Sequence, residues 1–90
     1  MAPERPEREL PEPSFRLLIA SLAAQVQVAL GLVENPITKK TERDLPIAQH
    51  GIAMLEILET KTKGNLDAED DAFLAQALYG LRMAYVRLRG

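Results

Sequence analysis

The sequence predicts an all-α fold with three helices, near residues 14–33, 44–63 and 67–89. Three observations carry this prediction. Apolar residues recur at helical spacing through each segment. No segment shows the alternation of apolar and polar residues that marks a half-buried strand. Each segment also begins at a residue type that commonly caps helix N-termini: Ser14, Asp44 and Asp67.

The composition predicts one soluble domain over residues 14–90. A chain of 90 residues has room for one domain at most. Its net charge of -2 gives no field of one sign that favours nucleic acid as a partner. The absence of cysteine excludes a disulfide framework and cysteine-ligated metal, and the single histidine, His50, excludes a multi-histidine site. We therefore expect no metal and no cofactor.

Residues 1–13 are predicted to be a disordered tail. They hold four of the six prolines together with several charged residues, and little that is apolar. Proline removes backbone donors, and a segment of this kind cannot bury enough apolar surface to fold.

The first helical segment is apolar on nearly every side, since 13 of the 17 residues from Leu17 to Val33 are apolar. Such a helix must be buried nearly all round. Two other helices of one chain cover only part of its surface, so the remaining face is expected to meet a second copy. This segment would reach about 25 Å, short of the roughly 30 Å of a bilayer core, so no membrane span is expected. The predicted homodimer face consists of Leu18, Leu22, Val26 and Ala29.

The second and third segments are predicted to form an antiparallel hairpin around a tight turn, with Gly64 in the left-handed conformation that ends a helix. A broad apolar face is predicted for the second segment, with Ala48 and Ile52 beside it. The residues of this face are Ile47, Gly51, Met54, Leu55, Leu58 and Thr62. In the third segment, Leu74, Leu81 and Leu88 recur every seven residues, which predicts a short heptad seam.

No pattern in the sequence indicates catalysis. A catalytic histidine needs an orienting carboxylate, and the helical neighbours of His50 include none. Glu56 and Glu59 lack the partner histidines of a carboxylate-bridged metal site and are expected on a solvated face. The sequence therefore predicts a protein that is not an enzyme.

The turn sequence Lys61-Thr62-Lys63-Gly64-Asn65-Leu66, followed by an acid-rich helix start, resembles the hallmark of the DUF1844 family of small bacterial proteins of unknown function. Asn35-Pro36 and Leu81-Arg82-Met83-Ala84-Tyr85 resemble other parts of the family pattern, and the likeness covers about residues 15–86. One departure is Ile52-Ala53, where the pattern leads us to expect Ile-Asp. The resemblance implies a bacterial cytoplasmic protein and supplies no activity.

The turn itself has two interpretations. In the structural one, the lysines complement the helix dipole, the glycine reverses the chain and the neighbouring residues cap the helices. In the functional one, ammonium groups, a hydroxyl and turn amides form an anion-binding or protein-docking site. That candidate site consists of Lys61, Thr62, Lys63, Gly64 and Asn65.

The leading expectation is a small helical oligomerisation or adaptor protein that acts through protein–protein contacts with a partner still to be identified. The alternative is an RNA- or ribosome-associated accessory protein that binds phosphate through basic residues. Phosphate binding weakens steeply as salt rises, whereas apolar docking does not, so salt dependence separates the two. The basic residues concerned are Lys39, Lys40, Arg43, Lys61, Lys63 and the segment Arg82–Arg89.

Overall fold

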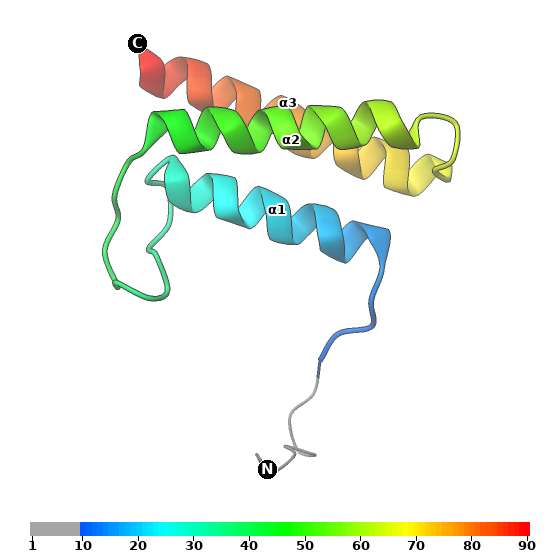
Figure 1. Cartoon of the computed structure of the whole chain (residues 1–90), viewed down its shortest axis with the longest axis horizontal. Helices are drawn as coiled ribbons and strands as arrows, with labels where there is room; N and C mark the ends of the chain where they lie inside the picture. Colours follow the sequence, from blue (N-terminus) through cyan, green and yellow to red (C-terminus); the bar gives the residue numbers. More distant parts are fainter. Residues whose placement is uncertain (1–9) are drawn as a thin grey trace.

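The computed structural model describes residues 10–90 and, within them, contains three α-helices (Figure 1). α1 spans Phe15–Ala29, α2 spans Leu45–Thr62 and α3 spans Ala68–Arg89. No strand occurs in this part of the chain, so the predicted all-α class is confirmed. Each helix contacts the other two, and α3 runs back alongside α2 in the opposite direction (Figure 1).

The three predicted N-caps are confirmed. The Ser14 hydroxyl oxygen accepts a hydrogen bond from the Leu17 amide at 3.0 Å. The carboxylates of Asp44 and Asp67 accept in the same way from amides three residues later, at 3.1 and 2.7 Å. Each cap satisfies a backbone donor that the first helical turn leaves free, which fixes where the helix begins. The expected disordered tail falls largely on residues 1–9, outside the described residues; residues 10–13 are exposed and form no helix.

α1 is shorter than predicted and ends at Ala29. Gly31 adopts the left-handed conformation with φ 77°, and the Leu32 amide donates to the Gln27 carbonyl at 3.0 Å. This is the Schellman arrangement that closes the carbonyl end of a helix. Leu30, the residue that caps the helix, is still fully buried, whereas Leu32 and Val33 beyond Gly31 are exposed. Hydrophobicity alone therefore overestimated the length of the helix.

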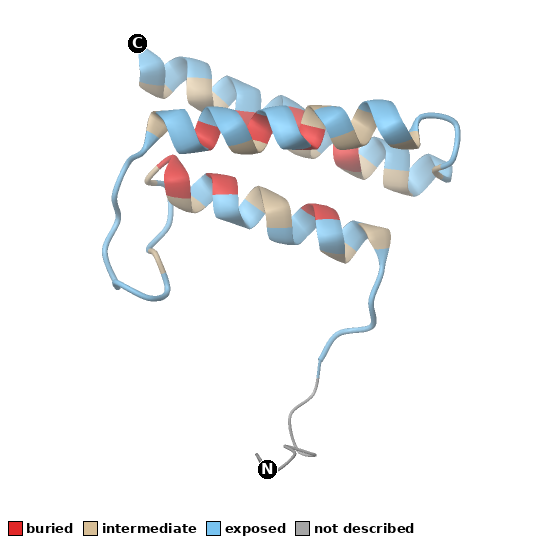
Figure 2. Cartoon of the chain, in the orientation of Figure 1, coloured by how far each residue is buried: buried red, intermediate tan, exposed pale blue. Residues whose placement is uncertain are grey.

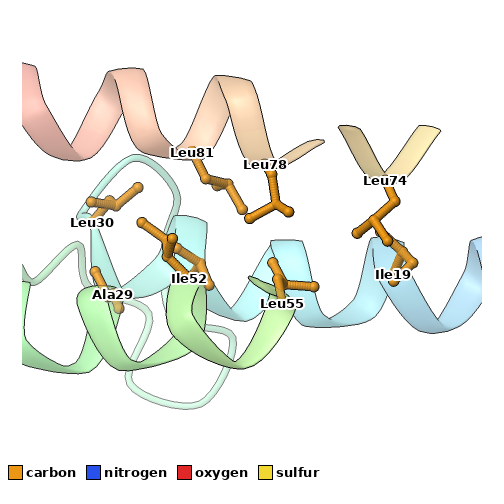
Figure 3. Close-up of a cluster of buried hydrophobic side chains, with 10 residues drawn as sticks. Ile19, Ala29, Leu30, Ile52, Leu55, Leu74, Leu78 and Leu81 are labelled. Atoms are coloured by element: carbon orange, nitrogen blue, oxygen red, sulfur yellow. The ribbon is translucent and has the colours of Figure 1, made fainter. Parts of the chain in front are cut away.

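The core consists of apolar side chains from the three helices and from Leu30, and the buried segments lie where the helices face one another (Figure 2). Leu74 of α3 lies opposite Ile19 of α1, and Leu78 points toward Leu55 of α2 (Figure 3). Among the described residues, no polar or charged side chain is buried. The buried set is Ile19, Val26, Ala29, Leu30, Ala48, Ile52, Leu55, Leu74, Leu78 and Leu81.

The buried face of α2 differs from the predicted one. It is centred on Ala48, Ile52 and Leu55, while Ile47 and Met54 are exposed at 60% and 51%. Apolar residues cover much of the circumference of α2, so periodicity does not specify which arc faces the core. Packing against both α1 and α3 selects the arc.

The predicted heptad seam of α3 packs inside the chain. Leu74 and Leu81 are buried in the core and Leu88 is half-buried. These side chains belong to one hydrophobic cluster with residues of α1 and α2, so the seven-residue repeat serves bundle packing within the chain.

Two polar contacts connect α3 to its neighbours. The Arg82 guanidinium donates to Glu56 Oε2 from both Nη2, at 2.8 Å, and Nε, at 3.0 Å. Arg16 lies 3.6 Å from the Asp70 carboxylate and 5.8 Å from the centre of the Phe73 ring. Both pairs are substantially exposed, so each stabilises the fold by less than about 1 kcal/mol. Glu56 thus has a defined partner that the sequence did not reveal.

A type II turn joins α2 to α3. Lys63 has φ -57° and ψ 129°, Gly64 has φ 85°, and the Asn65 amide donates to the Thr62 carbonyl at 2.9 Å. The third position of such a turn requires positive φ, which glycine adopts without strain. The predicted left-handed conformation of Gly64 is confirmed.

Replacement of Gly64 tests this turn. Gly64→Val is expected to lower the free energy of unfolding by about 1–2 kcal/mol through left-handed strain. Nothing lies within 4 Å of a side chain added there, so backbone strain is the only cost. Gly64→Asn is expected to cost less, because asparagine tolerates positive φ. Urea unfolding followed by circular dichroism measures both, and equal losses would contradict the argument.

Candidate functional site

The fold buries part of the predicted homodimer face of α1 and leaves the rest exposed. Val26 and Ala29 are buried in the core of their own chain and cannot also form an open surface. Leu22 is half-buried and Leu18 is exposed at 47%. Val26 is directed inward because it packs over Gly51 of α2. Only Leu18 and part of Leu22 are therefore open to a partner.

α2 carries a line of exposed apolar side chains. Ile57 is exposed at 56%, and with Ile47 and Met54 it occupies the solvent side of the helix. His50 and Lys61, also exposed, complete a series with alternating spacings of three and four residues. Residues at this spacing lie on one stripe of a helix and are the contact positions of paired helices. We call the stripe the α2 seam; it consists of Ile47, His50, Met54, Ile57 and Lys61.

Sequence reasoning missed the α2 seam because it assigned Ile47 and Met54 to the core. The sequence does contain a signal for the α2 seam, namely a second apolar stripe on the same helix. The core positions Ala48, Ile52 and Leu55 follow one helical stripe, and the seam residues follow another on the opposite side of the helix. A helix with two apolar stripes has one more than its own bundle can bury.

A groove of about 230 Å³ extends the apolar surface from the α2 seam onto α1. Leu18 lies one turn before Leu22 on α1, so both side chains are on the side of α1 that borders this groove. The residues that line the groove are Leu22, Gln25, Val26, Ile47, His50, Gly51 and Met54.

α3 has a separate apolar surface that faces solvent. Tyr79, Met83 and Val86 are exposed at 66%, 48% and 53%, and their spacing places them on one stripe. We call these three residues the α3 outer face. Arg82 and Arg87 stand next to it, so charge borders this surface more closely than it borders the α2 seam.

The candidate site at the α2–α3 turn consists of groups with local structural roles and two exposed cations. The Thr62 hydroxyl donates to the Leu58 carbonyl at 2.8 Å, and the Asn65 amide is used in the turn. Gly64 supplies the positive φ. Lys61 and Lys63 are exposed.

The basic residues of the alternative function do not gather on one surface. Lys39, Lys40 and Arg43 lie in the loop between α1 and α2, at the same end of the bundle as the C-terminus of α3 (Figure 1). The turn with Lys61 and Lys63 lies at the opposite end (Figure 1). Arg82 is engaged by Glu56.

His50 is exposed on the α2 seam between apolar neighbours. No group of three or more potential metal ligands is present among residues 10–90. Within the same residues, no helix combines the length and hydropathy needed to cross a bilayer.

The comparisons with known proteins give one match. A family model described as a domain of unknown function, DUF1844, matches residues 12–87, which include α1, α2 and all but the last two residues of α3. No curated protein and no solved structure matches the chain. The resemblance carried by the turn at residues 61–66 therefore extends over nearly the whole helical part.

Proposed function

We propose that this chain, which belongs to the DUF1844 family, is a helical oligomerisation and adaptor protein that acts through protein–protein contacts and not by catalysis. One observation carries the proposal. Within residues 10–90, eleven large hydrophobic residues are exposed, about as many as the ten that form the core. Single exposed apolar residues are normal in soluble proteins, whereas several in line on one helix mark an interaction surface.

The placement of these side chains supports contact with other proteins. Six of the eleven are divided equally between the α2 seam and the α3 outer face. Side chains in line along a helix suit docking of another helix, since helices pack along such stripes. Two separate surfaces suit an adaptor, which holds a copy of itself at one surface and a partner at the other.

Phosphate binding is supported less well. The basic residues are split between two ends of the bundle, and Glu34, Glu42 and Asp44 accompany those in the α1–α2 loop. A catalytic role also has little support, because catalytic groups act from desolvated pockets and no polar side chain is buried in the described residues. The proposal places the protein in the bacterial cytoplasm, in keeping with its lack of cysteine.

Light scattering coupled to size exclusion tests the proposal on the full chain. At micromolar concentration we expect a mass of twice the 10.0 kDa of one chain, falling toward 10.0 kDa on dilution. Raising the salt concentration should leave the mass unchanged, because apolar association is not screened by ions. A folded 10.0 kDa species at every concentration would contradict self-association. Salt-sensitive binding of the chain to RNA would instead favour the alternative.

A further inference from the structure

We infer that the α2 seam binds the α2 seam of a second copy of this chain, with the two helices antiparallel about a two-fold axis. The inference rests on the proposed function and specifies both the partner and the geometry of the contact.

The spacing of the α2 seam makes it complementary to itself. Ile47, Met54 and Lys61 occupy one type of contact position, and His50 and Ile57 occupy the other. In an antiparallel pair, the two types face each other. Ile47 of each copy then meets Ile57 of the other, and His50 meets Met54. The series is symmetric about residue 52, so one two-fold axis satisfies every apolar layer at once.

The residues beside the α2 seam allow a second helix to come close. Ala53 and Thr60 flank it on one side, and Gly51 and Leu58 flank it on the other. None of the four is charged, so the flanks of the seam bring no like charges together. Gly51 also marks the side on which α1 packs. The symmetry therefore places α1 of both copies on one side of the α2 pair, with Leu18 and Leu22 at the border of the contact.

The helix dipoles favour the antiparallel direction. Antiparallel helices place the negative end of one dipole beside the positive end of the next. In the symmetric register, Lys61 of one copy is level with the exposed Arg43 of the other, and the Asp44 cap follows about one residue, or 1.5 Å along the axis, further on. The charges at the two ends of the contact are therefore mixed and do not decide the direction.

The α3 outer face is less suited to the same kind of pairing. An antiparallel two-fold through Tyr79 and Met83 brings Arg82 of one copy near Arg82 of the other, so like charges oppose each other. On α2 the like-charged residues, Lys61 and Arg43, meet only at the ends of the contact, whereas on α3 they meet near its centre, which favours the α2 seam for self-association.

Two matched glutamate variants test the location of the contact. Met54→Glu lies on the α2 seam and Met83→Glu on the α3 outer face, at exposed fractions of 51% and 48%. Both exposed positions should retain the helical signal in circular dichroism. We expect Met54→Glu to reduce the mass from twice 10.0 kDa to 10.0 kDa and Met83→Glu to leave it unchanged. A dimer that survives Met54→Glu would overturn this inference while leaving the proposed function intact; a monomeric wild type would overturn both.

Introduced cysteines test the direction and register, since the natural chain has none. We expect the double variant Ile47→Cys with Ile57→Cys to form a disulfide-linked dimer under mild oxidation, visible on a non-reducing gel. Neither single variant should cross-link, because each position lies about 15 Å along the axis from its own copy, beyond disulfide reach. Parallel packing would reverse this pattern, with each single variant linking to itself, and that result would overturn the antiparallel geometry.

Discussion

Leu78→Ala is expected to lower the free energy of unfolding by about 3 kcal/mol, a large share of the stability of so small a domain. Leu78 lies in α3, is 0% exposed and points toward Leu55 in the centre of the core (Figure 3). Truncation removes buried apolar contacts and leaves a cavity, since side chains from three helices hold the surrounding positions.

Met83→Ala provides the control for this prediction. Met83 is on the same helix, and its side chain is similar in size to leucine but 48% exposed, so its loss should cost less than about 1 kcal/mol. Urea unfolding of both variants should be followed at one protein concentration, because self-association links stability to concentration. Equal destabilisation of the two would show that Leu78 is not at the centre of the core.

Gly51→Ala is expected to destabilise the chain by about 1–2 kcal/mol even though alanine is the better helix former. A Cβ at this position would lie 2.6 Å from Val26 Cγ2. Val26 is a stiff, β-branched side chain with 3% of its surface exposed, so it has little space into which to move. The overpacking cost therefore exceeds the gain of up to about 1 kcal/mol in helix propensity.

Gly80→Ala is the matched change without the clash. Gly80 lies in the interior of α3, and nothing is within 4 Å of an added Cβ. Alanine should there stabilise the chain by about 0.5–1 kcal/mol. Thermal unfolding should show a lower melting temperature for Gly51→Ala and a higher one for Gly80→Ala. A rise for both would mean that α1 and α2 can separate at Gly51 without cost.

The sequence predicted those features that depend on neighbouring residues. Ser14, Asp44 and Asp67 mark the starts of the helices because each side chain caps an amide three residues away. The turn at Gly64 could be predicted because it depends only on a residue that adopts positive φ at that position. The sequence also contained Gly31, the residue at which α1 ends, but the apolar run that continues to residue 33 obscured this signal.

The candidate interaction surface could be predicted only in part. Leu18 was expected on an open face and is exposed, whereas Val26, expected on the same face, is buried. Ile57 did not enter the prediction and is exposed on the α2 seam. On a helix that is apolar over much of its circumference, the choice between core and surface depends on where the other helices pack, and periodicity does not specify that direction.

By itself, the sequence determined the all-α class, the three helix starts, the turn at Gly64 and the family, because each depends on local chemistry or on a continuous pattern. Only the tertiary structure decided which apolar stripe of α2 is buried. The close approach of α1 at Gly51 and the packing of α3 against α2 fix the rotation of α2 in the bundle. That rotation buries Ile52 and leaves Ile47, Met54 and Ile57 open to a partner, because a helix packed against two neighbours can bury only the arc that faces them.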